Sequence, residues 1–193
     1  MSVHQRIAIT GASGLIGTAL VGHLKAEGHT VQRLVRRTPV GADEVQWDPQ
    51  TGFVDLEPLR GVDAVIHLAG VGVGDKRWSK KYKSEILNSR LLGTTAIAKA
   101  VAELKPQVFI SASAIGWYGE SGNRAVVEND RVGVDFLAAV CREWEAAADL
   151  AQDVRTVKIR TGLVLDPTGG ALGKMLPLFR LGLGGKLGNG KQW

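Results

Sequence analysis

The 193-residue sequence contains one cysteine, Cys141, and four histidines. A single cysteine excludes a disulfide within the chain, and the spacing of the histidines is not typical of a metal site. We therefore expect no bound metal and a reducing, cytoplasmic environment.

The sequence also lacks a uniformly apolar segment long enough to cross a membrane. Residues 7–24 contain no Lys, Arg, Asp or Glu and have about the length of a membrane span. Glycine and hydroxyl residues interrupt the apolar pattern there, and no signal-peptide cleavage region follows. This pattern predicts a soluble protein with no membrane partner.

Charge is not concentrated in any part of the chain. The net charge is +5 and the pI is about 9.5, but the basic residues are scattered and form no basic face interleaved with aromatic residues. We therefore expect no nucleic-acid partner. With 45% hydrophobic residues, the chain can bury the core of one domain, or of one domain and part of another.

The segment from Arg6 to Gly17 predicts a strand, a tight turn and a helix. An apolar run leads into glycines at positions 11, 14 and 17, and apolar residues follow at helical spacing. These glycines would allow a sharp turn, the close approach of a pyrophosphate and the packing of helix on strand, with the anion at the helix N-terminus. The alternative is a glycine turn with a structural role only. The predicted dinucleotide-binding residues are Thr10, Gly11, Ser13, Gly14, Leu15, Ile16 and Gly17.

Two arginines, Arg36 and Arg37, follow a second predicted strand at residues 31–35. In dinucleotide-binding folds, a carboxylate at this strand end binds the ribose 2′-OH of NAD, whereas arginine accommodates the 2′-phosphate of NADP. No Asp or Glu lies between Glu27 and Asp43. We therefore predict NADP(H) as the cofactor, with both arginines on its 2′-phosphate; the alternative is a solvated pair of arginines.

Strand and helix patterns alternate about six times along the chain, which is typical of an α/β fold with a doubly wound parallel sheet. Long amphipathic helices are predicted near residues 84–104 and 135–151. Ala69 and Gly70 end a central strand, where small residues let a cofactor lie across the sheet edge. We interpret His67, in the same strand, as a packed residue rather than a catalyst.

Several motifs resemble those of the extended short-chain dehydrogenase/reductase superfamily. The broad motifs are residues 10–17, 67–70 and 111–119. Narrower motifs, which are similar to those of the atypical branch named epimerase family proteins, are residues 75–78, 89–90, 144–145, 160–162, 169–172 and 188–193. The resemblance implies an NADP(H)-binding Rossmann fold over residues 1–165, with Leu68, Ala69 and Gly70 at the cofactor. Residues 166–193 would then begin a substrate-binding region that is incomplete.

The resemblance also implies a catalytic serine at Ser113, with Tyr118 as the nearby phenol. Superfamily members that move a hydride use a Tyr-x-x-x-Lys pair for proton transfer. An alignment on Glu145 places Leu137 and Cys141 at these two positions, and a shift of one residue places Phe136 and Val140 there. The usual pair is therefore absent from the sequence.

Three functions remain open. The first is an NADP(H)-dependent oxidoreductase or epimerase-like enzyme that acts on a small molecule, with Arg77, Arg90 and Arg160 as candidates for binding an anionic or sugar-nucleotide substrate. The second is a non-catalytic protein that binds NADP(H) or senses its redox state. The third is a regulator that binds a partner protein. The resemblance also suggests a homodimer formed through the two long helices.

Overall fold

The computed structural model describes residues 3–186 and 188–190. The chain divides into two compact units, Met1–Thr161 and Gly162–Trp193. Residues 187 and 191–193, which belong to the predicted substrate-binding region, lie outside the described residues. The division at residue 165 and the role of the second unit stay predictions.

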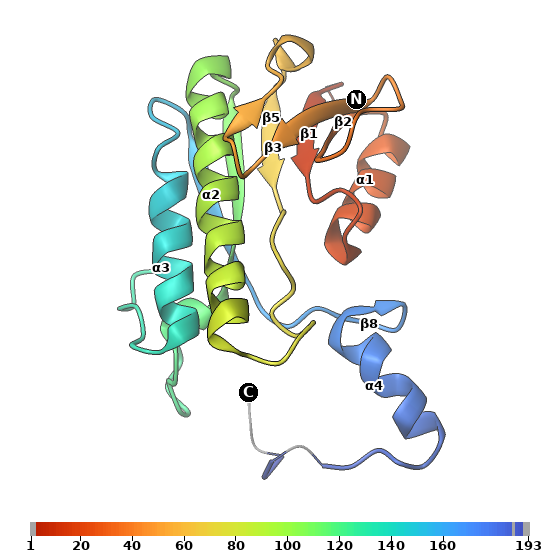
Figure 1. Cartoon of the computed structure of the whole chain (residues 1–193), viewed down its shortest axis with the longest axis vertical. Helices are drawn as coiled ribbons and strands as arrows, with labels where there is room; N and C mark the ends of the chain where they lie inside the picture. Colours follow the sequence, from red (N-terminus) through yellow and green to blue (C-terminus); the bar gives the residue numbers. More distant parts are fainter. Residues whose placement is uncertain (1–2, 187, 191–193) are drawn as a thin grey trace. The chain divides into compact units, whose positions relative to one another are not determined.

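The first unit is built on a seven-stranded sheet in the order β4-β3-β2-β1-β5-β6-β7 (Figure 1). The strands are β1 (Arg6–Thr10), β2 (Thr30–Val35), β3 (Glu44–Asp48), β4 (Phe53–Val54), β5 (Ala64–His67), β6 (Val108–Ala114) and β7 (Thr156–Thr161). All neighbouring pairs are parallel except β3 and β4. The prediction of an α/β fold with a doubly wound, mostly parallel sheet is confirmed.

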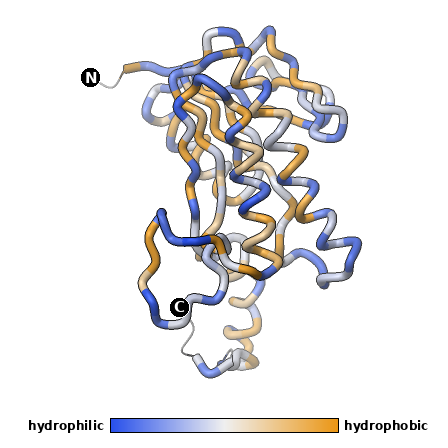
Figure 2. Tube along the Cα trace, turned by 90° about the vertical axis from the view of Figure 1, so that its left-hand side faces the viewer, coloured by the Kyte–Doolittle hydropathy of each residue, from blue (hydrophilic) through white to orange (hydrophobic). Residues whose placement is uncertain are grey.

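Alternation along β1 explains why helices cover both faces of the sheet. Ile7 and Ile9 are buried on the face that packs against α1 (Leu15–Ala26). Ala8 faces the opposite way, into the core formed with α2 (Lys80–Leu104), and α3 (Phe136–Ala148) packs beside α2. In Figure 2, hydrophobic and hydrophilic stretches alternate along the helices, as expected when one side of a helix covers a sheet.

Helix α2 begins earlier than its apolar spacing predicts, because Ser79 caps it. The Ser79 hydroxyl accepts the backbone N–H of Tyr82, which satisfies one of the free donors of the first turn. Three lysines surround Tyr82 in the first turn, so the apolar pattern is weak there although Tyr82 itself is buried. Two short 3₁₀ helices, η1 (Glu57–Leu59) and η2 (Ile115–Tyr118), complete the described elements of the first unit.

Besides the two 3₁₀ helices, three described elements were not predicted from the sequence. Strand β4 has two residues and follows a turn in which Gly52 has a positive φ of 78°, so it is too short to show a pattern. The second unit contains β8 (Leu165–Asp166) and α4 (Gly170–Arg180). Helix α4 has apolar residues at helical spacing, but it contains Pro177 in its interior, which disfavours a helix, and none of its residues is buried.

Residues 7–24 divide between β1, the glycine turn and most of α1, which has 12 residues. Among the residues that the structure describes, no helix has both the length and the apolar character needed to span a bilayer.

Candidate functional site

The glycine turn between β1 and α1 is packed so closely that two of its positions exclude a side chain. Gly11 has φ +68°, and a Cβ there would lie 2.8 Å from the carbonyl carbon of Leu68 and 2.9 Å from the nitrogen of Ala69. A Cβ on Gly17 would lie 2.1 Å from the carbonyl oxygen of Gly11. The backbone of the turn therefore lies directly against the end of β5.

Helix α1 begins without a side-chain cap. Gly14 is its N-cap residue and makes no side-chain hydrogen bond, and the first turn contains no acidic residue. Ser13, Gly14 and Ile16 are exposed, whereas Gly17 is buried. Backbone N–H groups at an uncapped helix N-terminus attract anions, so this cradle fits the pyrophosphate of a dinucleotide.

Thr10 joins the glycine turn to the end of β5. Its Oγ1 accepts the N–H groups of Leu68 and Ala69, at 3.2 and 3.3 Å, and lies 2.7 Å from Nδ1 of His67. Because Oγ1 already accepts two hydrogen bonds, the Thr10 hydroxyl donates to Nδ1, which places the imidazole proton on Nε2. Burial lowers the pKa of His67 to about 3, so the ring is neutral. Four predicted cofactor residues, Thr10, Gly11, Leu68 and Ala69, thus lie together.

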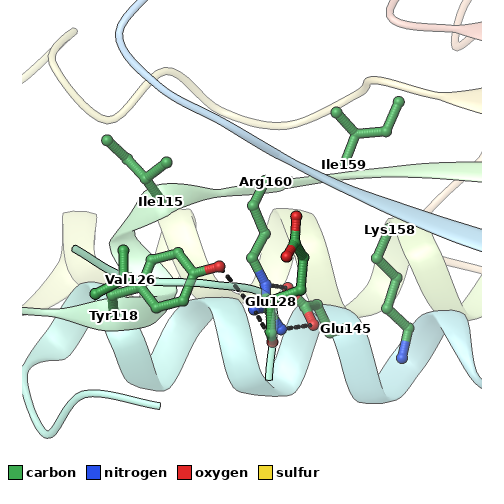
Figure 3. Close-up of a pocket in the computed structure, with 8 residues that line it drawn as sticks. All are labelled: Ile115, Tyr118, Val126, Glu128, Glu145, Lys158, Ile159 and Arg160. Carbon is green, nitrogen blue, oxygen red and sulfur yellow. Dashed lines mark hydrogen bonds and ion pairs between the residues drawn. The ribbon is translucent and has the colours of Figure 1, made fainter. Parts of the chain in front are cut away.

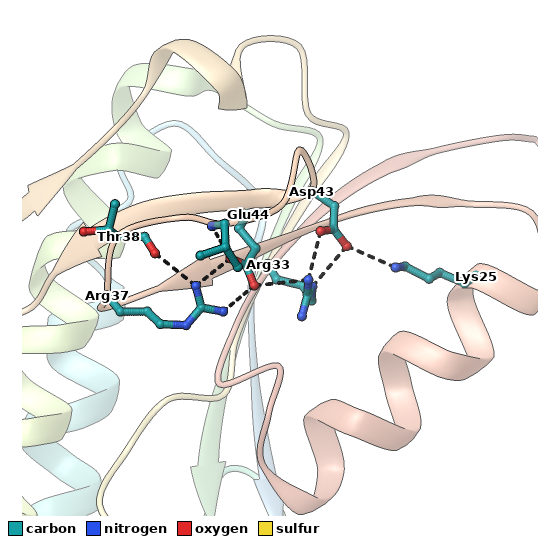
Figure 4. Close-up of polar contacts among 7 residues, drawn as sticks. Lys25, Arg33, Arg37, Thr38, Asp43 and Glu44 are labelled. Atoms are coloured by element: carbon teal, nitrogen blue, oxygen red, sulfur yellow. Dashed lines mark hydrogen bonds and ion pairs between the residues drawn. The ribbon is translucent and has the colours of Figure 1, made fainter.

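Arg36 and Arg37 follow the end of β2 and are both exposed. Arg37 donates to Glu44 through Nη1 at 2.7 Å and Nη2 at 2.6 Å, as Figure 4 shows. These hydrogen bonds are the main reason that the pKa of Glu44 falls to about 2. Glu44 was not predicted from the sequence, although an acidic residue seven positions after a basic pair is a signal that could have suggested it.

A second cluster lies at the ends of β6 and β7. The Ser113 hydroxyl donates to Glu145 Oε1 at 2.6 Å, and Arg160 binds both oxygens of Glu145, at 2.8 and 2.9 Å. Nη1 of Arg160 donates to the Tyr118 hydroxyl at 3.1 Å and to the carbonyl oxygen of Glu128 at 2.9 Å (Figure 3). The structure therefore brings together Ser113, Tyr118 and Arg160. Glu145, which was predicted only as part of a family motif and as the residue for aligning α3, connects them.

The electrostatics of this cluster keep both Glu145 and Arg160 ionised. Burial raises the pKa of Glu145, but hydrogen bonds from Arg160 and Ser113 outweigh it, so the net shift is downward. Glu145 in turn raises the pKa of Arg160. The guanidinium also stacks 3.9 Å from the centre of the Trp117 ring. Arg160 thus uses four of its five N–H donors within the protein.

A pocket of about 710 Å³ opens beside this cluster, entirely within the first unit. Its lining combines charged and apolar side chains (Figure 3). The lining residues are Ile115, Tyr118, Val126, Glu128, Glu145, Lys158, Ile159 and Arg160. A small molecule could therefore meet the Tyr118 hydroxyl and an apolar wall in the same cavity.

Leu137 and Cys141 lie against η2, close to Gly116. A Cβ on Gly116 would lie 3.3 Å from Leu137 Cβ and 3.6 Å from Cys141 Sγ. Burial raises the pKa of the Cys141 thiol, which keeps it protonated. Neither residue reproduces the phenol and ammonium of the usual pair.

The other two arginines proposed for substrate binding differ from each other. Arg90 is half-buried; it donates Nη1 to the carbonyl oxygens of Val71 and Ile86, and its guanidinium lies 4.9 Å from the centre of the Trp144 ring. A Cβ on Gly70 would lie 3.4 Å from its Cζ, so Arg90 adjoins the end of β5. Arg77 is exposed in the loop before α2, and among the described residues no hydrogen bond or ion pair places it in either cluster.

A mostly parallel, doubly wound sheet with a tight glycine turn before its first helix places the protein in the Rossmann-type α/β class. The chain belongs to the NAD-dependent epimerase/dehydratase family, whose model matches residues 7–133. The expected relationship to epimerase family proteins is confirmed. An epimerase family protein of Mycobacterium leprae is 46% identical over 189 residues, which are 97% of this chain and 62% of that protein.

Two solved structures are also similar. The nucleoside-diphosphate sugar epimerase of Corynebacterium glutamicum has a TM-score of 0.85 and 39% identity, and the match covers 99% of this chain and 40% of that one. Human epimerase family protein SDR39U1 (isoform 2) with NADPH has a TM-score of 0.85 and 35% identity, over 97% of this chain and 63% of that one. The chain therefore spans less than two thirds of each of these relatives.

Proposed function

We propose that the protein is an NADP(H)-dependent oxidoreductase or epimerase-like enzyme of the extended short-chain dehydrogenase type, acting on a small molecule. The observation that carries this proposal is the glycine cradle: Gly11 and Gly17 exclude side chains next to an uncapped helix N-terminus. The human relative SDR39U1, whose structure contains NADPH, supports the same cofactor.

The preference for NADP(H) over NAD(H) rests on the end of β2. Arg36 and Arg37 are exposed there, and the carboxylate bound to Arg37, on Glu44, has a side chain that is only 2% exposed. Glu44 is therefore not available to accept the hydroxyls of a ribose, whereas the two guanidinium groups can bind a phosphate.

The chain's own residues supply proton handling and positioning. A bound nicotinamide dinucleotide would supply hydride transfer. The Tyr118 hydroxyl accepts an N–H from Arg160 and so keeps its own proton for donation to a substrate oxygen. The Ser113 hydroxyl donates a hydrogen bond to Glu145 and keeps lone pairs that can accept a hydrogen bond from a substrate hydroxyl.

An anionic substrate is supported by Arg90 more than by Arg160. Most donors of Arg160 are bound within the protein, whereas Arg90 has no ion pair with a carboxylate among residues 3–186 and 188–190. A half-buried cation without an acidic partner is stabilised by an anionic ligand. The relative from C. glutamicum is named as a nucleoside-diphosphate sugar epimerase, which is consistent with a substrate of this charge.

A second candidate function is non-catalytic binding of NADP(H), as in a redox sensor. The observation that favours it is the pair Leu137 and Cys141, which lie against η2 and carry no group suited to proton transfer. A cytoplasmic location, supported by the buried free thiol of Cys141, belongs to both proposals. The homodimer through the two long helices stays a prediction.

The cofactor proposal is tested by titrating NADPH and NADH in parallel, with tryptophan fluorescence and calorimetry. We expect clear NADPH preference, and the Arg36→Ala/Arg37→Ala double variant should lose about 10- to 100-fold in NADPH affinity with little change for NADH. Equal losses for both cofactors would contradict the assignment of the two arginines. Absence of binding by folded protein would contradict the cofactor proposal as a whole.

Catalysis is tested separately with carbonyl and sugar-nucleotide substrates in the presence of NADPH. Turnover that falls in Ser113→Ala and Tyr118→Phe, with NADPH affinity unchanged, would support the enzyme. Tight NADPH binding without turnover of any substrate would instead favour the non-catalytic protein. Because the relatives are longer than this chain, the same substrates should be tried with a full-length relative.

A further inference from the structure

Glu44 lies at the centre of the loop that carries Arg36 and Arg37. Its carboxylate accepts the backbone N–H of Val40 at 2.9 Å, both terminal nitrogens of Arg37, and Nη2 of Arg33 at 3.2 Å. A carboxylate with several donors has little freedom to move. The conformation of the loop and the direction of Arg37 are therefore fixed by one buried acidic side chain.

The way in which Glu44 holds Arg37 leaves one edge of the guanidinium open. Nη1 donates to the carbonyl oxygen of Thr38 and to Glu44, and Nη2 donates to Glu44. Three of the five N–H donors of Arg37 are thus used, and Nε–H and the second Nη2–H remain. These two donors form the side-on fork that binds carboxylate or phosphate in a bidentate manner. The Arg37 side chain is 55% exposed, so this fork is accessible.

The same corner is anchored to α1. Asp43 accepts from Nε and Nη2 of Arg33, and Lys25 of α1 pairs with Asp43 at 3.1 Å (Figure 4). Hydrogen bonds from Arg33, followed by those from Lys25, hold the pKa of Asp43 at about 2. Three cations and two anions leave this network positive, and the exposed Arg36 adds a further charge. The corner is suited to a dianionic phosphate.

We propose that Glu44 is a positioning residue for cofactor choice: by holding Arg37 end-on, it presents the Nε edge of that guanidinium to the 2′-phosphate of NADP(H). The proposal rests on the proposed NADP(H) function. Glu44 acts only through Arg37 and does not touch the cofactor. Arg36 contributes positive charge, whereas Arg37 contributes hydrogen-bond donors whose orientation is fixed by Glu44.

Glu44→Asp separates geometry from charge, because it keeps the carboxylate but withdraws it by one methylene. Calorimetry with NADPH and NADH should show that it weakens NADPH binding about 5- to 10-fold and leaves NADH binding within about twofold. Glu57→Asp is a matched control: Glu57 pairs with Arg60 on the surface, outside this loop, and its variant should change neither affinity.

A double-mutant cycle tests whether Glu44 acts through Arg37. In an Arg37→Ala background, Glu44→Asp should have no further effect on NADPH affinity, because its route of action is already removed. Equal losses for NADPH and NADH, unchanged NADPH affinity, or a full additional loss in the Arg37→Ala background would each overturn the proposal. Wild-type protein without NADPH preference would instead contradict the proposed function, so the two failures are distinguishable.

Discussion

The glycine turn and the Ser113–Arg160 cluster lie in the same unit but are specified in different ways. The turn is defined by three glycines within seven positions, and its geometry depends on the backbone. The cluster joins β6, η2, α3 and β7, and its hydrogen bonds connect residues that are 15 to 42 positions apart. The glycine turn can be found from spacing, whereas the hydrogen bonds that connect the cluster are visible only in the folded chain.

The largest expected effect comes from adding one methyl group to the glycine turn. In Gly17→Ala, the Cβ would lie 2.1 Å from a backbone oxygen of Gly11, so the turn must move. We expect a loss of about 4 kcal/mol in unfolding free energy and no measurable NADPH binding. Urea unfolding and NADPH titration measure the two effects.

Gly22→Ala is the matched control, because Gly22 lies in the same helix and a Cβ there meets no atom within 4 Å. It should raise the unfolding free energy by about 0.5–1 kcal/mol, since alanine favours helix over glycine. If Gly17→Ala were as stable as Gly22→Ala and still bound NADPH, the turn would not depend on the backbone contact described above.

The same contrast explains how far the sequence predicts this protein. The sheet class and the positions of α1 to α3 follow from apolar patterns, and the glycine turn follows from spacing. Glu44 and Glu145 were missed because each is one acidic residue among 19 acidic residues in the sequence, and only the fold shows that they are buried beside arginines. Strand β4 was missed because two residues show no pattern, and helix α4 because Pro177 interrupts a segment whose apolar spacing is otherwise helical.

The next largest effect should come from the side-chain cluster. Glu145→Ala leaves Arg160 without its carboxylate, and the Arg160 side chain is only 16% exposed. We expect a loss of about 3 kcal/mol in unfolding free energy, with the glycine turn and NADPH binding preserved. Urea unfolding measures the loss.

Ser113→Ala is the control for the cluster, because it removes one donor from Glu145 and leaves the ion pair with Arg160 intact. Ser113→Ala should lower the unfolding free energy by about 1 kcal/mol. Equal losses in Glu145→Ala and Ser113→Ala would show that the ion pair adds nothing to stability beyond the serine hydrogen bond.

A pH effect should arise from the Thr10–His67 pair. The pKa of folded His67 is about 3, below its ordinary value of 6.5, so between these values the unfolded chain binds a proton that the folded chain does not. The unfolding free energy is therefore highest, as far as His67 is concerned, above pH 6.5. It decreases as the pH falls toward 3, by up to about 1.4 kcal/mol per pH unit. Asp43 and Glu44 add to acid sensitivity only below their ordinary values of 3.8 and 4.5.

Urea unfolding between pH 7 and pH 5 therefore isolates the histidine from these two carboxylates. His67→Gln, which cannot be protonated, should remove most of the pH dependence in this range. A slope that is the same in the variant and the wild-type protein would show that burial of His67 does not control acid sensitivity.

The smallest expected effect concerns the two ways in which helices begin. Helix α2 is capped by the Ser79 hydroxyl, whereas α1 begins at Gly14 without a side-chain cap. Ser79→Ala removes a structural cap and should lower the unfolding free energy by about 1 kcal/mol while NADPH affinity stays constant.

Gly14→Ser would place a side-chain acceptor where we expect the pyrophosphate, so it should weaken NADPH binding while stability changes little. If Gly14→Ser bound NADPH as tightly as the wild-type protein, the free N–H groups of α1 would not be the anion site.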